Sequence, residues 1–600
     1  MHYKASLAAV SVSLLALSTL PTQLFGAENA ILQGRVSSNQ QLGFDIYLPL
    51  QHRDQLERQL ADLHNPSSPN YQKWLTPAEF NAIYAASSSQ HRAIVAQLTS
   101  YGLDAHSVSA HRIHVTGTAA ATERALGTVL KMGQFSSGKS TVAASKPLTM
   151  NGALLESHAV ITAFSGTIHM RSHSQPVATP QNRYTPAGPY WFDDLKQAYR
   201  FPSFQSYTGK GATIGILMSG NFNPSDMDKY FAHEKLATPK FSTINVDGGS
   251  PFDPNSSFET HLDMQQSGGT APEANVILYN LPDLSDTHIM DGLSQIITDN
   301  KVDIVNMSFG GAELYYTAAY NSGTDLTSVL RQEDDLFAQG NAQGITFIAS
   351  SGDAGALAAL PVSCAYAPVP NCGQFVASVE FPASSPHVTG VGGTNLVTTH
   401  SGIRGNLNSA YVREQAFADP LAGDIQFQTS ATGGFWGSGG GDSILFSKPF
   451  FQNFVATGND SFRTVPDLSL HMGGCPAGTV NNFCNPDDSA DIEAIGGSYV
   501  GVIGTSASAP DFAGLTALAV ERFGRRLGNE NYYIYALAAA QYAGLPIKVY
   551  NKNIPGSNGL YSTNVKGYDR VLGNGTVNGT NFLLAPRGPV AGIPQTPSNP

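Results

Sequence analysis

Short apolar runs alternate with amphipathic stretches along the larger, C-terminal part of the chain. The apolar runs end in small or polar residues and lie at residues 212–217, 274–279, 303–308 and 345–350. The amphipathic stretches between them include residues 290–300 and 326–339. Apolar runs of this length predict buried strands, and their alternation with helices predicts a parallel sheet flanked by helices. In such a sheet, chemistry is expected at the carboxyl ends of the strands.

The N-terminal part of the chain shows a different pattern. Residues 44–48 and 111–115 alternate as strands do, and residues 53–63 have the spacing of an amphipathic helix. Residues 76–79 form a capping box with proline at the first helical position. This part therefore predicts a small α+β domain ahead of the α/β domain.

A proline-rich segment separates the two parts. Residues 175–189 contain four prolines and little apolar periodicity, which is typical of a linker. We expect a leader over residues 1–27, an N-terminal domain over 28–175, a linker over 176–189, a larger domain over 190–585 and a flexible tail over 586–600. A chain of 600 residues is long enough for two folded units with their own cores.

Composition and charge exclude some classes of protein. With 42% hydrophobic residues the chain is globular, and its net charge of −12 argues against a nucleic-acid partner. Its charged fraction of 13% is about half the usual share, which suits a protein that must tolerate acid. Ten of the 16 histidines lie within residues 1–178. Either the two domains form an electrostatic pair that changes as these histidines titrate, or they are ordinary surface histidines.

The first residues have the pattern of a secretory signal peptide. Lys4 precedes an apolar run over residues 5–20, Pro21 ends that run, and Gly26 and Ala27 offer a small-residue cleavage region. We therefore expect a protein that is secreted to the extracellular space or the periplasm and has no membrane attachment once the signal is removed. An uncleaved N-terminal anchor is the alternative.

Export also accounts for the four cysteines, which lie as two local pairs, Cys364/Cys372 and Cys475/Cys484. An oxidising compartment predicts two disulfides, with other pairings left open. A four-thiolate zinc site is the alternative, but the gaps of seven and eight residues do not match zinc-knuckle spacing.

The strongest local motif is Gly504-Thr505-Ser506, which is followed by an apolar helix over residues 511–523. It places a serine at a helix N-terminus, where unpaired N–H groups and the helix dipole favour a developing anion. Ser506 is therefore a candidate nucleophile, with an ordinary N-cap as the alternative. A nucleophilic serine also needs a base and an oxyanion donor.

Two carboxylates are the candidate base. Hydrolases that use this serine motif in a subtilisin-like setting take their base from a His-Gly-Thr stretch, and this chain has none. At the matching place it has Glu259 and Asp263, which are four residues apart and so share one face of a helix. Close carboxylates raise one pKa, which makes Glu259 a candidate general base oriented by Asp263. A solvated acidic face, or a paired-carboxylate glycosidase that leaves Ser506 idle, would also fit this pair.

Asp353 is the candidate oxyanion donor. It follows the predicted strand at residues 345–350 and lies next to Gly352, which allows close approach. A protonated carboxyl group at this place can donate a hydrogen bond to a tetrahedral oxyanion, whereas an ionised one repels it. An Asx-turn residue in a glycine-rich loop is the alternative.

Together these motifs resemble the sedolisin family, the serine-carboxyl peptidases. The matching segments are residues 63–76, 259–263, 305–310, 351–353, 381–386 and 504–506. The resemblance implies a subtilisin-like catalytic domain preceded by a ferredoxin-like activation prodomain of the pro-kumamolisin type, which inhibits the enzyme intramolecularly. The roles it assigns are nucleophile for Ser506, base for Glu259, supporting acid for Asp263 and oxyanion-stabilising acid for Asp353. Ala354 stands where the family usually has a serine.

The resemblance also implies one structural calcium ion near the C-terminus. Its predicted ligands are Asn553, Ile554, Val565, Gly567 and Asp569. Calcium prefers six or more oxygens, of which main-chain carbonyls and the Asp569 carboxylate would supply several. Asn553 stands where the family has an aspartate. Weaker calcium binding and a loop without calcium are therefore both alternatives.

These inferences predict a secreted, monomeric serine endopeptidase, made as a zymogen, that cleaves protein or peptide substrates through an acyl-enzyme. Asp353 must be protonated while the Glu259/Asp263 pair keeps partial charge, so activity should follow a bell-shaped pH profile centred well below neutrality. The alternatives are a Ser/His/Asp peptidase that uses one of the six C-terminal histidines and a non-catalytic secreted binding protein on a peptidase fold.

Overall fold

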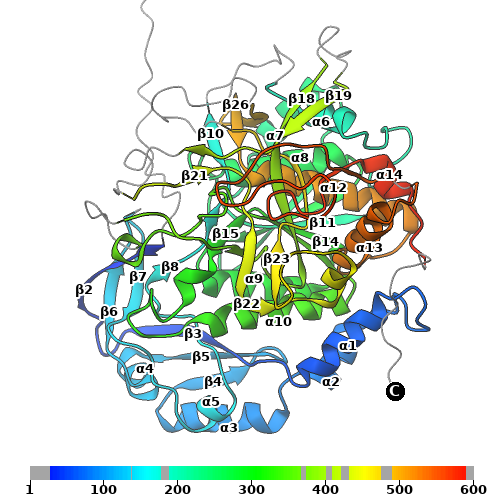
Figure 1. The fold of residues 1–600 in the computed structure, drawn as a ribbon. Helices are drawn as coiled ribbons and strands as arrows, with labels where there is room; N and C mark the ends of the chain where they lie inside the picture. Colours follow the sequence, from blue (N-terminus) through cyan, green and yellow to red (C-terminus); the bar gives the residue numbers. More distant parts are fainter. Residues whose placement is uncertain are drawn as a thin grey trace, which may run out of the picture.

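A sheet of mostly parallel strands forms the centre of the larger domain (Figure 1). The computed structural model describes residues 27–136, 138–177, 188–365, 373–399, 409–420, 431–474, 489–546 and 548–588. The strand order is β12 (Lys240–Asn245), β13 (Asn275–Leu281), β11 (Thr213–Ser219), β14 (Ile304–Met307), β16 (Thr346–Ser350), β18 (Val388–Thr398), β24 (Leu468–His471), β28 (Thr576–Val577) and β27 (Tyr550–Asn551). Along this order all neighbours are parallel except β28 and β27. The predicted parallel sheet is confirmed, and the four apolar runs are β11, β13, β14 and β16.

Helices flank this sheet. α8 (Phe258–Thr270) packs against α12 (Thr505–Phe523), and both contact central strands. α9 (Asp286–Asp299) packs against α10 (Thr327–Ala342), and in Figure 1 this second pair lies between the sheet and the N-terminal domain. Further helices are α6 (Phe192–Ala198), α7 (Pro224–His233), α13 (Asn531–Tyr542) and α14 (Gly579–Leu584). The helices predicted at residues 290–300 and 326–339 correspond to α9 and α10.

The N-terminal domain combines two antiparallel three-stranded sheets with short helices. The sheets are β3 (Gln41–Tyr47), β5 (Arg112–Thr118) and β4 (Asp104–Ser107), and β2 (Ile31–Arg35), β6 (Leu130–Gln134) and β7 (Ser140–Ala144). The helices are α1 (Arg53–Leu63), α2 (Pro77–Tyr84), α3 (Ser88–Ser100), α4 (Ala119–Leu126) and α5 (Gly152–Glu156). The predicted capping box is present, since Thr76 and Glu79 each accept a hydrogen bond from the other's backbone N–H.

The N-terminal domain packs on the larger domain through α1 and α10. Leu56 and Leu60 of α1 are buried in one cluster with Ala338 and Ala342 of α10. At the end of this contact, Arg53 forms ion pairs with two aspartates of α10, Asp334 and Asp335. The contact between α1 and α10 therefore combines an apolar cluster with ion pairs.

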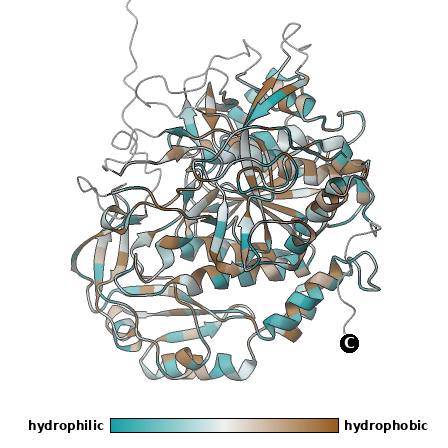
Figure 2. Ribbon diagram, in the orientation of Figure 1, coloured by the Kyte–Doolittle hydropathy of each residue, from teal (hydrophilic) through white to brown (hydrophobic). Residues whose placement is uncertain are grey.

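Hydrophobic residues are concentrated in the central sheet and on the inner sides of its helices (Figure 2). Every residue of β14, β16 and β18 is buried, as expected for parallel strands that are covered on both faces. A rigid, covered sheet of this kind presents the carboxyl ends of its strands as fixed positions for functional side chains.

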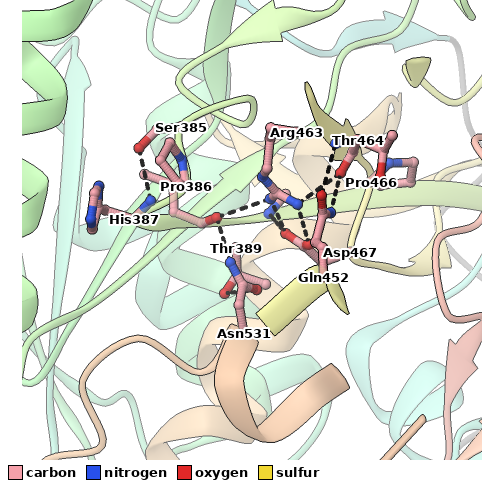
Figure 3. Close-up of polar contacts among 12 residues, drawn as sticks. Ser385, Pro386, His387, Thr389, Gln452, Arg463, Thr464, Pro466, Asp467 and Asn531 are labelled. Carbon is pink, nitrogen blue, oxygen red and sulfur yellow. Dashed lines mark hydrogen bonds and ion pairs between the residues drawn. The ribbon is translucent and has the colours of Figure 1, made fainter. Parts of the chain in front are cut away.

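A buried ion pair lies beside β18 and β24 and is hydrogen-bonded to β18 (Figure 3). Arg463 donates to both carboxylate oxygens of Asp467 at 2.7 and 2.6 Å, and the Tyr535 hydroxyl donates to the same carboxylate at 2.8 Å. Asp467 also accepts the Gly390 N–H of β18. Because both charges are buried, removal of either partner leaves an uncompensated charge in the core.

Some sequence-based predictions fall outside the described residues. These are most of the leader over 1–27, residues 178–187 of the linker, most of the tail over 586–600, and Cys372, Cys475 and Cys484. Cys364 is disulfide-bonded. Within the described ranges, no helix combines the length and apolar character needed to cross a bilayer.

Candidate active site

The four predicted catalytic residues lie on three separate elements of the larger domain. Glu259 and Asp263 are on α8, Asp353 follows β16, and Ser506 is in the first turn of α12. All four side chains are buried, with exposed fractions of 0 to 3%. The contacts described below connect them into one site.

The two carboxylates on α8 share a desolvated environment. Glu259 Oε2 accepts a hydrogen bond from Ser174, and Asp263 Oδ1 accepts one from Ser308. Burial raises the pKa of both groups well above the ordinary range, and for Glu259 the charge of Asp263 adds to the rise. The nearby Ser506 hydroxyl acts in the opposite direction and lowers the pKa of Glu259. Such a pair can hold a shared proton and exchange it with a neighbouring hydroxyl.

A third buried carboxyl group lies near this pair and was not found from the sequence. Glu493 is on β25 (Asp491–Ile495), and neither of its carboxylate oxygens has a hydrogen-bond partner among the described residues. Burial raises its pKa well above the ordinary range, and the charges of Glu259 and Asp263 raise it further. The sequence of β25 does not indicate that Glu493 lies near Glu259 and Asp263, which are more than 200 positions earlier in the chain.

Asp353 is held by the residue that precedes the nucleophile. The Thr505 N–H and hydroxyl donate to Asp353 Oδ1 at 2.7 and 2.8 Å, while Oδ2 has no partner among the described residues. Burial raises the pKa of Asp353 to about 7. Below that pH the carboxyl is protonated, and its free oxygen can donate a hydrogen bond to an anion.

Helix α12 begins at Thr505, six residues earlier than the apolar pattern predicted. Pro510, the sixth residue of the helix, has no N–H to donate to the carbonyl of Ser506 one turn earlier. Ser506 therefore lies inside the first turn, where backbone N–H groups have no intrahelical acceptor. Its hydroxyl donates to the Ser308 carbonyl at 3.3 Å, and its own N–H remains available for another acceptor.

That acceptor is the carbonyl oxygen of His173, in the segment that connects the two domains. The Ser506 N–H donates to it at 3.1 Å, and the His173 N–H donates to Ser308 O at 3.2 Å. A side chain at Gly504 would lie 2.1 Å from this carbonyl oxygen and 2.7 Å from Asp353 Oδ2, so both atoms border the same small space. Gly504, with φ of 140°, leaves that space open.

The connecting segment lies in the site as an extended strand. On one side, β9 (Arg171–Ser172) pairs antiparallel with β15 (Phe309–Ala312). On the other side, β10 (Gln175–Val177) pairs antiparallel with β26 (Ser498–Ile503). Main-chain pairing of this kind is how proteins bind extended peptides at a strand edge. The sequence predicted a linker only from residue 176, and its insertion between two strands depends on tertiary contacts.

The His173 side chain is buried among polar groups. Its ring nitrogens lie 2.7 Å from Ser350 Oγ and 2.6 Å from Glu380 Oε2, and Arg171 contacts the other oxygen of Glu380 at 3.2 Å. Burial alone would raise the pKa of Glu380, but the charges of His173 and Arg171 outweigh it and lower the pKa. Glu380 was also missed from the sequence, where it stands before the recognised 381–386 segment.

Among the described residues of the larger domain, no histidine takes the place of a base beside Ser506. His261, which lies between the two carboxylates in sequence, uses both ring nitrogens for backbone contacts, with Ala494 O at 2.9 Å and Asn223 N at 3.1 Å. Burial lowers its pKa. The carboxylate pair is thus the available base in this geometry.

One of the predicted calcium ligands, Asp569, is paired with an ammonium group. The Lys552 Nζ donates to the Asp569 carboxylate at 2.8 Å, and the Val565 side chain is exposed. Among the described residues, no three histidine, cysteine, aspartate or glutamate side chains are grouped to hold a metal. A second cation beside Asp569 would be repelled by Lys552, so the residues present do not fit calcium well.

Two family models match the chain. Residues 28–161 match the pro-kumamolisin activation domain, and residues 249–575, more than half of the chain, match the subtilase family. Xanthomonalisin from Xanthomonas sp. (strain T-22) is 28% identical over 573 residues, which cover 89% of this chain. The chain spans 64% of the length of that relative. Kumamolisin from Bacillus sp. (strain MN-32) is 26% identical over 576 residues, covering 93% of this chain and 94% of that protein.

A solved structure supports the same assignment. Pseudomonas sedolisin, a serine-carboxyl proteinase complexed with two molecules of pseudo-iodotyrostatin, matches with a TM-score of 0.51 at 25% identity, covering 68% of this chain and 98% of that one. The predicted subtilisin-like α/β fold with an N-terminal prodomain is therefore confirmed. The chain belongs to the subtilase family and carries a pro-kumamolisin activation domain, which confirms its resemblance to the sedolisins.

Proposed function

We propose that the protein is the zymogen of an acid-acting serine-carboxyl endopeptidase. In this proposal Ser506 is the nucleophile, Glu259 the general base, Asp263 the acid that supports it, and Asp353 the oxyanion donor. The observation that supports it most directly is the His173 carbonyl, which accepts the Ser506 N–H beside the free oxygen of Asp353. A peptide carbonyl at this position has the surroundings that acyl transfer requires.

The proposed reaction proceeds in two halves. Ser506 Oγ bonds to the carbonyl carbon while its proton passes to Glu259, and protonated Asp353 and the Ser506 N–H stabilise the oxyanion. The C–N bond then breaks as Glu259 returns the proton to the leaving amine. Water, deprotonated by Glu259, hydrolyses the acyl-enzyme and restores the Ser506 hydroxyl. Asp263 orients Glu259, and the two carboxyl groups share one negative charge.

The first substrate in this proposal is the enzyme's own connecting segment. The bond that faces Ser506 joins His173 to Ser174, and the Ser174 hydroxyl already contacts Glu259. Cleavage there would free the activation domain and leave Ser174 as a new N-terminus. Because the His173 side chain contacts the Glu380 carboxylate, later protein or peptide substrates would be favoured when a cationic side chain precedes the cleaved bond.

The proposed setting is outside the cytoplasm. The leader over residues 1–27 would direct export, and the mature enzyme would be a soluble monomer. Retention of the prodomain until acidification would protect the producing cell from its own peptidase.

The proposal is tested with purified full-length protein between pH 2 and pH 8, alongside Ser506→Ala, Glu259→Gln and a control, Glu273→Gln, which changes an exposed glutamate. We expect casein digestion in acid and a new N-terminus at Ser174 for the parent and the control, and neither for the other two variants. A neutral optimum that survives Glu259→Gln would indicate a histidine base. An intact, inactive chain at every pH would favour a binding protein on a peptidase fold.

A further inference from the structure

Lys552 is a buried lysine at the end of the central sheet. It directly follows β27, and its side chain is 8% exposed. Its ammonium group donates to Asp569 Oδ2 at 2.8 Å and to the Gly573 carbonyl at 3.1 Å. A buried ammonium group is costly unless it is paired and hydrogen-bonded, and both conditions are met here.

The Asp569 carboxylate is fully engaged around this ammonium group. Oδ2 also accepts the Asn564 N–H at 2.8 Å, and Oδ1 accepts the N–H groups of Val571 and Leu572 at 3.0 and 2.8 Å. With Lys552 these four donors match the roughly four acceptor positions of a carboxylate. No acceptor position of Asp569 is then left for a metal ion, which would need six to eight oxygens at about 2.3–2.6 Å.

We infer that the Lys552 ammonium group performs the structural role that the sedolisin resemblance gives to calcium, and that the fold of this enzyme is independent of calcium. The loop it holds carries Ile554, Val571 and Leu572 into one small apolar cluster with Ala416. The ammonium group therefore connects β27, the Asp569 turn and this cluster without a bound ion. Asn553, whose family counterpart is an aspartate, is exposed and takes no part in the contact.

The first test measures calcium binding and the effect of calcium on the melting temperature. The full-length Ser506→Ala protein, which cannot process itself if the proposed nucleophile is correct, is melted with 5 mM EDTA and with 5 mM CaCl2, and calcium is titrated by calorimetry. We expect the same melting temperature within about 1 °C and no binding heat. A single site of submillimolar affinity, or a clear loss of melting temperature in EDTA, would overturn the inference. These readouts do not depend on peptidase activity.

The second test removes the ammonium group of Lys552. Lys552→Met should lower the melting temperature by about 5 °C, because it leaves a buried carboxylate without its partner. Lys566→Met, which removes an exposed lysine from the same loop, should leave it unchanged. The double variant Lys552→Ser/Asn553→Asp should gain a stabilising response to calcium. If Lys552→Met melts like the parent, the inference is wrong; if it does not fold, the calcium titration of the parent still decides.

Discussion

At the scale of single residues, the protonation of the Asp353 carboxyl group makes the rate of the proposed reaction depend on pH. Its folded pKa of about 7 means that it is protonated in acid and ionises as the pH rises through neutrality. The ionised form would repel the oxyanion, so activity should be lost across this range. The Glu259/Asp263 pair has the opposite requirement, because it must be partly ionised to accept a proton.

Replacing Asp353 with asparagine should separate these two requirements. The amide oxygen can keep the hydrogen bonds from Thr505, while the NH2 group takes the place of the free oxygen and donates at every pH. We expect Asp353→Asn to retain activity above pH 7, where the parent loses it, with a lower maximum. The measurement is kcat/KM against pH for one peptide. An alkaline limb at the same pH as in the parent would contradict the assigned role.

Glu380 is the residue on which the proposed substrate preference rests. Removing its charge with Glu380→Gln should lower kcat/KM about 10-fold or more for peptides with arginine before the cleaved bond, since a hydrogen bond to a charged group contributes about 1.5–3 kcal/mol. A matched peptide with leucine at that position is the control and should be cleaved at least as well as by the parent. Equal losses for both peptides would mean that Glu380 supports the fold instead.

At this scale, the sequence can point to candidate residues where a residue type belongs to a local motif. Ser506 and Asp353 follow recognisable glycine-containing turns, and the spacing of Glu259 and Asp263 places both on one helix face. Glu380 and Lys552 could not be found in this way. Their roles depend on partners that tertiary folding brings together, and a lone acid or lysine in a sequence has no such signature.

At the scale of elements, the end of α1 links the prodomain to the catalytic domain through a histidine. His64 lies next to Leu63 at the C-terminal end of the helix, and its Nδ1 contacts Leu60 O at 2.6 Å. Its Nε2 accepts the Asn529 N–H of the catalytic domain at 2.8 Å, so this nitrogen cannot carry a proton while the contact exists. Burial lowers the pKa of His64 to about 4.

Acid should therefore weaken this contact. The folded pKa lies below the ordinary histidine value of about 6.5, so the released prodomain binds a proton that the docked one excludes, and docking loses stability as the pH falls from about 6.5 to 4. His64→Gln removes the titration and should shift half-maximal processing to a lower pH by about half a unit or more. His106→Gln changes an exposed prodomain histidine and serves as the control. Identical processing curves for the two variants would exclude His64 as a trigger.

Most elements were predictable because burial leaves a pattern in the sequence. A strand covered on both faces is a continuous apolar run, and a helix with one buried face has an apolar repeat of helical period. The helix predicted at residues 53–63 is α1 with the same bounds, and the four predicted strands of the catalytic domain each start one residue later than predicted. The start of α12 was predicted too late, because Pro510 is typical of a helix start in the sequence but lies inside this helix, at its sixth residue. The insertion of β9 and β10 into the site was not predictable, because their partners come from distant strands.

At the scale of the whole molecule, the contact between the two domains and the catalytic domain itself respond to acid in opposite directions. The contact between the domains depends on charge. Partial burial would raise the pKa of Glu57, whose side chain stays 45% exposed, but the charges of His387 and Arg53 lower it to about 2. Such a depressed carboxylate stabilises the contact above its unfolded pKa, near 4.5, and this contribution is lost as the pH falls toward 2. The catalytic domain instead buries carboxyl groups that stay neutral, and burial raises the pKa of Asp511 to about 8.

A raised carboxyl pKa stabilises the fold below the unfolded value, and this contribution is lost as the pH rises through the folded value. The catalytic domain, freed from the Ser506→Ala chain by cleavage in trans, should therefore melt at a higher temperature at pH 4 than at pH 8. Asp511→Asn keeps a neutral group at every pH and should reduce that difference by a few degrees, whereas Asp460→Asn changes a fully exposed carboxylate and should not. A melting temperature that rises toward pH 8 would mean that ion pairs dominate the catalytic domain. The expected opposite trend would make acid both the condition that loosens the prodomain and the condition in which the freed enzyme is most stable.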